Sequence, residues 1–265
     1  MSTLQDLQAQ VSELIAAHAA DRAEIEALKA ALAQRGAAEP AASAPPAPEV
    51  LLAVADAAVV PVVSIAEVET AVPLARSVVA GGLRVIEIVF RTTAAEESLA
   101  RICQEVPELI VGAGTVLSVA QAERAVAAGA RFIVAPGLNA SVVRWCLARG
   151  VAVLPGVATP TEIEAALALG LTHLKFFPAE TLGGVSALKA LSAPYGAAGL
   201  RFMPTGGVTL EKLPAYLALP AVIAVGGSWM VPADALKARA YDKITQLVAK
   251  AVDAVAGVRP KRAKA

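Results

Sequence analysis

The sequence predicts an α/β protein whose main part is a (β/α)8 barrel. From about residue 59 onward, short apolar runs rich in β-branched residues alternate with amphipathic helical stretches. Near-continuous apolar strands separated by helices are typical of a parallel sheet that helices cover. About eight such units in roughly two hundred residues is the number expected for a compact barrel. An open doubly wound sheet is the alternative, but it usually carries a glycine fingerprint after its first strand, where Ala66-Glu67-Val68-Glu69 stands here.

Each unit repeats the same order of an apolar run, a turn of small residues and a helical stretch. The expected strands are Val59–Ile65, Arg84–Phe90, Leu109–Thr115, Arg131–Pro136, Ala152–Val157, His173–Pro178, Arg201–Thr205 and Val222–Gly227. The expected helices include Ala66–Ala80, Ala94–Glu105, Val119–Ala128, Ala140–Ala148, Thr161–Leu169, Val185–Leu191 and Leu210–Leu217. In such a barrel the functional residues are expected at the carboxyl ends of the strands.

Residues 1–36 are expected to form a coiled-coil helix that precedes the barrel. Apolar residues recur there at alternating three- and four-residue steps, and the polar His18 and Asp21 interrupt this seam in the middle. Polar seam residues usually fix the register or the oligomer number. A single amphipathic helix lying on its own domain is the alternative. In either case the helix needs a partner surface, because an isolated helix of this length is marginally stable in water.

The remaining boundaries follow from composition. Residues 37–48 are rich in proline and alanine, and we expect them to be a semi-extended linker. The barrel is expected to occupy residues 49–257. Residues 258–265 form a short basic end, which we expect to be a solvated tail.

Composition and charge argue against several classes of partner. The 265 residues include 23 Lys and Arg and 23 Asp and Glu, so charge gives no reason to expect nucleic acid or an anionic membrane as a partner. The longest apolar stretch, Val50–Ala66, is broken by Asp56 and Pro61 and is not expected to span a membrane. No secretory signal is expected at the start.

Cys103 and Cys146 lack metal-ligand spacing, and we expect them to be reduced core residues of a cytoplasmic protein.

Lys175 is the most informative residue of the sequence. It lies in the apolar run His173-Leu174-Lys175-Phe176-Phe177, which is expected to be a buried strand. Lysine is rarely buried unless it is paired or functional. Desolvation disfavours the ammonium form and leaves an amine that is able to attack a carbonyl. The alternative is a lysine at the end of the strand, with its stem packed and its amino group in water.

The alternation of side chains along the strands places further polar groups inside the barrel. Ile86, Ile88 and Phe90 share one face of the second strand, which should pack under the helices. Glu87 and Arg91 then point to the interior, where Lys175 of the sixth strand is expected to face Glu87. The hydroxyl of Thr115, at the end of the third strand, is aimed at the same mouth. A purely structural Glu–Arg pair along one strand is the alternative.

Paired glycines end the last two expected strands, in Pro204-Thr205-Gly206-Gly207 and in Gly226-Gly227-Ser228. Glycine pairs expose backbone N–H groups and let an anion approach closely. A phosphate site after the seventh and eighth strands is a recurrent feature of (β/α)8 barrels. One such pair is common in ordinary turns, but two pairs at consecutive strand ends favour a phosphate site.

Short motifs follow one another in a fixed order along the barrel. They are Val60-Pro61-Val62-Val63, Gly81-Gly82-Leu83-Arg84-Val85-Ile86-Glu87, Arg91-Thr92, Val111-Gly112-Ala113-Gly114-Thr115-Val116-Leu117, Pro136-Gly137-Leu138, Leu154-Pro155-Gly156-Val157, Lys175-Phe176-Phe177-Pro178-Ala179-Glu180, Pro204-Thr205-Gly206-Gly207-Val208 and Gly226-Gly227-Ser228-Trp229-Met230-Val231-Pro232. From about Val59 to Val255 the chain thereby resembles the 2-keto-3-deoxy-6-phosphogluconate (KDPG) aldolase family. Residues 1–48 have no counterpart in that family pattern.

The resemblance implies a homotrimeric class I aldolase that needs no metal or other cofactor. It implies cleavage of KDPG to pyruvate and glyceraldehyde 3-phosphate. Lys175 matches the Schiff-base lysine and Glu87 the acid/base carboxylate of the family. Arg91 and Thr115 match residues that hold the carboxylate end of the keto acid.

The resemblance also assigns the rest of the expected site. Apolar contacts at the site are matched by Phe177 and Pro136. The phosphate cradle is matched by Gly206, Gly207, Gly227 and Ser228, and Thr205 is a plausible contact to a substrate hydroxyl. His173 is not a hallmark of the family, and we expect it to be a packing or local tuning residue.

Two other functions are consistent with the sequence. The first is a related pyruvate aldolase, such as a 4-hydroxy-2-oxoglutarate (KHG) aldolase, an aldolase for the galactonate-type epimer, or an oxaloacetate decarboxylase side activity. The glycine pairs favour the phosphorylated substrate over these. The second is a trimeric assembly scaffold, natural or engineered, that uses the coiled-coil arm to join copies of itself or another protein. Charges retained in the interior at Lys175, Glu87 and Arg91 favour an enzyme, because a scaffold does not need them.

Overall fold

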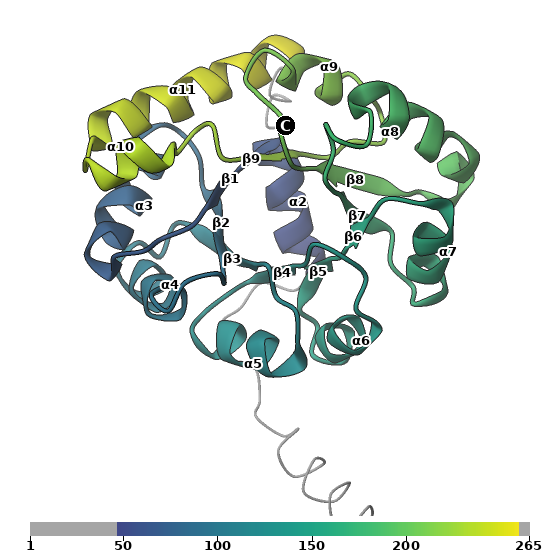
Figure 1. Ribbon diagram of the computed structural model, residues 1–265, viewed down its shortest axis with the longest axis horizontal. Helices are drawn as coiled ribbons and strands as arrows, with labels where there is room; N and C mark the ends of the chain where they lie inside the picture. Colours follow the sequence, from purple (N-terminus) through teal and green to yellow (C-terminus); the bar gives the residue numbers. More distant parts are fainter. Residues whose placement is uncertain (1–46, 260–265) are drawn as a thin grey trace, which may run out of the picture. The chain divides into compact units, whose positions relative to one another are not determined.

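Parallel strands alternate with helices along residues 47–259, which are the residues that this computed structural model describes (Figure 1). In chain order the elements are α2 (Ala47–Ala57), β1 (Val59–Val63), η1 (Val68–Thr70), α3 (Ala71–Ala80), β2 (Val85–Val89), α4 (Ala95–Glu105), β3 (Ile110–Gly114), α5 (Val119–Ala127), β4 (Phe132–Val134), α6 (Ala140–Ala148), β5 (Ala152–Leu154), β6 (Gly156–Val157), α7 (Pro160–Ala168), β7 (His173–Phe176), α8 (Gly184–Ser192), η2 (Ala193–Ala198), β8 (Arg201–Pro204), α9 (Leu213–Leu217), β9 (Val225–Gly227), α10 (Ala233–Lys237) and α11 (Tyr241–Val258). Each expected strand has its counterpart among them.

The strands form two curled parallel sheets. The first has the order β5-β4-β3-β2-β1-β9 and the second the order β6-β7-β8. Isolated parallel bridges from Phe202 to Val222 and from Thr205 to Gly226 join the second sheet to the segment that contains β9. Figure 1 shows the strands in a ring with most of the helices outside it. A parallel α/β fold with a curled, barrel-like sheet is therefore confirmed.

The expected strand Ala152–Val157 is divided in two. Pro155 separates β5 from β6, and the two pieces pair in different sheets, β5 with β4 and β6 with β7. Proline has no N–H to donate to a ladder, so a strand is commonly interrupted at this residue. The carbonyl of Pro155 still accepts a hydrogen bond of 2.9 Å from the backbone N–H of Lys175. The break lies directly beside the strand that carries this lysine.

Two expected helices are shorter than the sequence indicated. The expected helix Ala66–Ala80 starts as the short η1, and its α-helical part begins only at Ala71. Of the stretch Leu210–Leu217, only residues from Leu213 on are helical. Prolines in the first turns, Pro73 and Pro214, explain both starts, because proline fits the first turn of a helix and breaks its interior.

Helix α2 is a part of the barrel domain that the sequence did not predict. It includes Ala47 and Pro48, which had been expected to end the linker, so the expected boundary at residue 49 is wrong by two residues. Val50 and Val54 of α2 are fully buried and belong to an inner apolar cluster with residues of the amino ends of the strands, among them Val60 and Val85. In Figure 1, α2 lies within the ring of strands. It therefore closes the end of the ring opposite to the carboxyl ends.

A second apolar cluster fills the space between the strands and the surrounding helices. It includes Ile86 and Ile88 of β2, while Val85 belongs to the inner cluster. The alternation expected for the second strand is therefore confirmed. Glu87 points to the inside of the ring because its neighbours on either side, Ile86 and Ile88, pack under helices.

Residues 258–265 are expected from the sequence to form a solvated tail, but Arg259 does not belong to one. Helix α11 continues to Val258, and the guanidinium of Arg259 donates hydrogen bonds to the carbonyls of Leu217, Val222 and Ile223 at 2.7–3.0 Å. Carbonyls at the end of a helix and in the turn after it lack backbone partners, and a guanidinium satisfies several of them at once. The barrel domain thus extends at least to this residue.

Some expectations concern residues outside the described range. These are the coiled-coil helix of residues 1–36, nearly all of the linker 37–48 and the basic end after Arg259. Along residues 47–259, no helix has the length and apolar character that crossing a membrane requires.

Candidate active site

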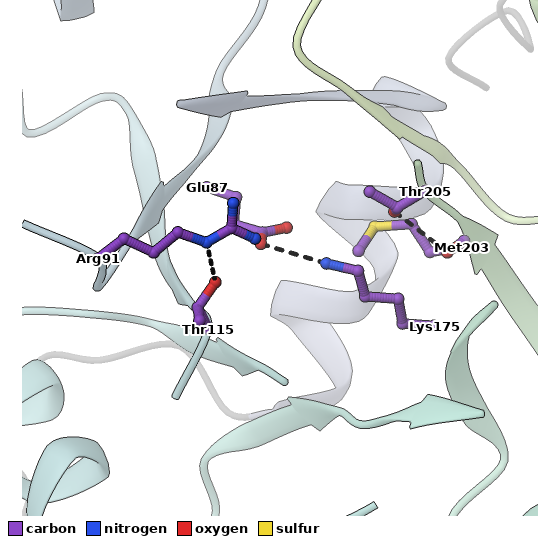
Figure 2. Close-up of polar contacts among 6 residues, drawn as sticks. All are labelled: Glu87, Arg91, Thr115, Lys175, Met203 and Thr205. Atoms are coloured by element: carbon purple, nitrogen blue, oxygen red, sulfur yellow. Dashed lines mark hydrogen bonds and ion pairs between the residues drawn. The ribbon is translucent and has the colours of Figure 1, made fainter. Parts of the chain in front are cut away.

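Glu87 and Lys175 face each other across the inside of the ring (Figure 2). Glu87 lies in the middle of β2 and Lys175 in β7, and the lysine Nζ is 3.5 Å from the carboxylate Oε1. Glu87 has no exposed surface and Lys175 is 5% exposed. The expectation that these two side chains meet is confirmed. A buried ion pair is a costly arrangement, and it is therefore a candidate for function.

The second carboxylate oxygen of Glu87, Oε2, is buried and has no hydrogen-bond partner among the described residues. Buried polar atoms are nearly always hydrogen-bonded, so an unpaired carboxylate oxygen calls for an explanation. A hydroxyl group of a substrate, or a water molecule held beside it, would supply the missing donor. Glu87 is thus placed both to pair with the amine and to accept a proton.

Two glycines of β3 make room for this arrangement. A Cβ atom on Gly114 would overlap the carboxylate of Glu87, and one on Gly112 would overlap the ring of Phe132. Phe132 is fully buried in the inner cluster and fills the interior toward the amino ends of the strands. The motif Gly112-Ala113-Gly114 therefore supports the site sterically, a role that the sequence analysis did not identify. Its signal was two glycines with the spacing of one strand face.

Arg91 and Thr115 lie together at the carboxyl ends of β2 and β3 (Figure 2). The Nε of Arg91 donates a hydrogen bond of 3.1 Å to Oγ1 of Thr115. Among the described residues, this is the only hydrogen bond that the Arg91 side chain makes to protein. Its Nη groups remain for a ligand, and a guanidinium is suited to bind a carboxylate through two parallel hydrogen bonds. The pair sits on the same side of Lys175 as Glu87.

The ring of Phe177 lies beside the lysine, whereas Pro136 lies beside the neighbouring strand β6. Nζ of Lys175 is 5.3 Å from the centroid of the Phe177 ring. Pro136 lies farther along the ring of strands, where its backbone carbonyl contacts Gly156 so closely that a side chain at that glycine would collide with it. Gly156 is in turn the register partner of Lys175. Phe177 is therefore placed at the lysine itself, and Pro136 next to the strand that pairs with β7.

The glycine pairs lie at the ends of neighbouring strands, as expected. Thr205 follows β8, is 6% exposed, and forms a parallel bridge with Gly226 of β9. Gly206 and Gly207 have φ angles of 104° and 76°, a left-handed conformation that favours glycine. A side chain at Gly227 would collide with the ring of Trp229.

Ser228, the last residue expected in the cradle, is exposed. Its hydroxyl is therefore accessible to a ligand at the carboxyl end of β9. The cradle residues of both strands lie at the end of the ring that also carries Arg91 and Thr115.

Charged and polar groups beside the cradle were missed by the sequence analysis. Glu180 follows Pro178 by two residues and accepts hydrogen bonds from Lys212 and from the hydroxyl of Tyr216. The hydrogen bond from Lys212 is the main cause that lowers the pKa of Glu180. Burial, followed by the hydrogen bond to this carboxylate, raises the pKa of Tyr216. The sequence held no signal for this cluster, because its members are 32 and 36 residues apart.

His173 lies two residues before Lys175, on the same face of β7, and is half-buried. Its Nδ1 is 3.1 Å from the hydroxyl of Thr172. Burial, together with the positive charge of Arg201, lowers its pKa. Among residues 47–259, no group of three or more His, Cys, Asp or Glu side chains is arranged to hold a metal ion.

The sequence profile of the family described as KDPG and KHG aldolase matches residues 51–247, which is most of the chain. The chain belongs to this family. The 2-dehydro-3-deoxy-phosphogluconate aldolase of Treponema pallidum is 52% identical to it over 189 residues, which cover 71% of this chain and 89% of that protein.

Solved structures of KDPG aldolases resemble the fold of this KDPG/KHG aldolase family member. The enzyme of Legionella pneumophila, with pyruvate captured as a covalent carbinolamine, has a TM-score of 0.72 at 39% identity and covers 75% of this chain and 96% of its own. The enzyme of Zymomonas mobilis, in complex with 3-phosphoglycerate, has a TM-score of 0.71 at 41% identity and covers 80% and 97%.

Proposed function

We propose that this member of the family is a class I aldolase that cleaves KDPG to pyruvate and glyceraldehyde 3-phosphate. The observation that carries the proposal is the buried amine of Lys175 facing Glu87 at 3.5 Å. An amine in a confined site beside a carboxylate is suited to form an imine with a ketone. The pyruvate carbinolamine in the Legionella enzyme supports the same chemistry here.

In the proposed mechanism, the neutral amine of Lys175 adds to the C2 ketone of KDPG, and loss of water gives an iminium ion. Glu87, directly or through a water, accepts the proton of the C4 hydroxyl. The electron pair of the C3–C4 bond then moves to the iminium, which releases glyceraldehyde 3-phosphate and leaves a pyruvate enamine. Protonation of the enamine at C3 and hydrolysis of the resulting imine return pyruvate and the free amine.

The other residues would hold the two ends of the substrate. Arg91 and Thr115 are proposed to bind the carboxylate of the keto acid, with Phe177 and Pro136 as apolar contacts. The positive φ angles of the glycines after β8 support a phosphate cradle there. Gly206, Gly207, Gly227 and Ser228 would form it, and Thr205 would contact a substrate hydroxyl. Binding of 3-phosphoglycerate by the Zymomonas enzyme supports this assignment.

A KHG aldolase is the second candidate, because the family profile includes both activities. The substrates differ in the phosphate, so the ratio of kcat/KM for KDPG to that for 4-hydroxy-2-oxoglutarate decides between them. We expect KDPG to be preferred, since a second glycine-lined turn would be superfluous for a substrate without phosphate. A preference for 4-hydroxy-2-oxoglutarate would overturn the assignment of the cradle.

Three further features belong to the proposal. We infer that the two curled sheets act together as one (β/α)8 barrel, with the bridge between Thr205 and Gly226 in support. We also infer a homotrimer, which the family resemblance favours, with the N-terminal arm as a site of further assembly. Light scattering of the full chain tests this assembly state. A cytoplasmic location is favoured by the two free cysteines, Cys103 and Cys146.

Borohydride trapping tests the proposed chemistry directly. The protein is incubated with pyruvate, reduced with borohydride and digested, and the peptides are analysed by mass spectrometry. We expect a stable adduct on Lys175. A folded protein that gives no adduct would contradict the class I mechanism and favour the scaffold alternative.

A further inference from the structure

Glu180 connects three segments around the glycine turn after β8. Its backbone N–H donates to the carbonyl of Gly206 at 3.0 Å, and the preceding residue, Ala179, donates to the carbonyl of Thr205 at 2.8 Å. Its side chain packs against the turn as well, since a Cβ atom on Gly207 would lie 2.9 Å from Cβ of Glu180. The turn that would hold a phosphate therefore rests on the segment that follows β7.

The carboxylate of Glu180 reaches past this turn to the next helix. Oε1 accepts a hydrogen bond of 2.7 Å from the hydroxyl of Tyr216 in α9, and Oε2 pairs with Nζ of Lys212 directly before α9. Tyr216 has no exposed surface, whereas the side chain of Glu180 is 22% exposed. Gly184, the first residue of α8, packs against the same two groups, because a Cβ atom there would lie 3.5 Å from Glu180 Oε1 and Tyr216 Oη.

These contacts fix both ends of one loop of the chain. The segment between Gly207 and Lys212 leaves β8 and enters α9, and Glu180 contacts both of its ends. A loop with both ends fixed loses most of its freedom, so its backbone N–H groups keep a constant direction. None of the contacts requires Glu180 to touch a substrate, and its negative charge is balanced by Lys212.

We propose that Glu180 is a positioning residue for the phosphate group of the substrate. Its carboxylate anchors α9 through Tyr216 and Lys212, and with it the far end of the loop that starts at Gly206-Gly207, so that the backbone N–H groups of the turn are preorganised for a phosphate monoester. The inference rests on the proposed function only in placing the phosphate at this turn. Glu180 thereby sets the affinity for phosphorylated substrates and leaves the chemistry at Lys175 unaffected.

Glu180→Ala tests the proposal, with Glu164→Ala as the matched control. Glu164 also accepts a hydrogen bond from a tyrosine hydroxyl, that of Tyr195 at 3.2 Å, but on an exposed surface. The measurements are KM for KDPG, the dissociation constant of glycerol 3-phosphate by calorimetry, and the rate of deuterium exchange into the methyl group of pyruvate. The exchange needs the imine but no phosphate.

We expect Glu180→Ala to raise both KM for KDPG and the dissociation constant of glycerol 3-phosphate about tenfold. Without the anchor, the N–H groups that bind the phosphate can shift, and a misplacement of about 1 Å can cost up to 10²-fold. Pyruvate exchange should stay within about twofold of wild type, as expected for a change in binding alone. Glu164→Ala should change none of the three. If Glu180→Ala does not fold, Glu180→Gln and Tyr216→Phe replace it, each with an expected increase of about threefold for one weakened hydrogen bond.

The outcomes separate this inference from the proposed function. A wild-type protein that cleaves KDPG, together with variants whose phosphate affinity is unchanged, overturns the positioning role alone. Equal losses in KDPG cleavage and in pyruvate exchange overturn it too, since they would indicate a general structural role. A wild-type protein that binds glycerol 3-phosphate more tightly than Glu180→Ala but does not cleave KDPG supports the positioning role and contradicts the proposed substrate. A wild-type protein that binds no glycerol 3-phosphate overturns the inference.

Discussion

At the scale of single residues, the structure places buried charged groups, which are costly for stability, around the amine of Lys175. Lys175 and Glu87 are both buried, and one carboxylate oxygen has no partner among the described residues. Burial of charged groups without full hydrogen bonding lowers stability, so such a group is retained where it serves a reaction. The residue-scale predictions therefore concern the lysine, the carboxylate and the glycine that makes room for it.

Replacing the lysine should remove the reaction. We expect Lys175→Ala to reduce kcat on the order of 10⁴-fold or more, because the variant lacks the amine that is proposed to form the imine. The measurement is KDPG cleavage coupled to pyruvate detection, with circular dichroism as a control for folding. A folded variant with substantial activity would show that another group carries the chemistry.

Replacing the carboxylate should slow proton transfer while the imine still forms. We expect Glu87→Gln to lower kcat about 10²–10⁴-fold, the range typical of a general acid–base residue. Borohydride trapping with pyruvate should still label Lys175 in this variant. Unchanged kcat would assign the proton transfers to another group.

Gly114→Ala should impair the site without touching the substrate. The added methyl group would overlap the Glu87 carboxylate and displace it, so we expect kcat to fall about 10–10²-fold while trapping on Lys175 persists. Gly257→Ala is the matched control, because nothing lies within 4 Å of the position of its Cβ atom. Equal kinetics for the two variants would mean that Glu87 adapts.

At the scale of elements, α2 is the part of the domain whose role became visible only in three dimensions. Val54 is fully buried against the inner cluster, whereas Leu52 of the same helix is 63% exposed. A helix with one apolar side against the amino ends of the strands contributes to stability by the area that it buries. It packs toward the amino ends of the strands, whereas the candidate site lies toward their carboxyl ends.

A pair of substitutions in α2 tests this role. We expect Val54→Ala to lower the free energy of unfolding by about 2 kcal/mol, whereas Leu52→Ala should change it by less than about 0.5 kcal/mol. Urea unfolding followed by circular dichroism measures both. Neither variant should change kcat/KM. Equal stability of the two variants would show that α2 is not docked in solution.

At the scale of the whole molecule, stability should depend on pH through His173. Burial and Arg201 lower its pKa in the folded state, whereas an unfolded histidine has a pKa of about 6.5. Below about pH 6.5 the unfolded chain therefore binds more protons than the folded one, and stability falls as the pH decreases. We expect the Tm of wild type to fall more steeply than that of His173→Gln between about pH 6.5 and 5. Parallel curves for the two proteins would contradict this assignment.

The periodic features of this protein can be predicted from its sequence. The alternation of apolar runs and helices predicted the parallel α/β fold, and the period of two along a strand predicted that Glu87 points inward. Burial of Lys175 followed from its apolar neighbours. These predictions succeeded because each depends on the local periodicity of a strand or helix, which is visible as a regular spacing of apolar and polar residues.

The contacts between distant segments depend on how the whole chain packs. The closure of the inner cluster by α2, the anchoring of Arg259 on three carbonyls and the link from Glu180 to Lys212 and Tyr216 leave no periodic signal. Each joins residues from separate elements whose distance depends on the twist and register of the strands between them. These quantities come from packing the whole domain, so no local pattern of residues could have revealed them.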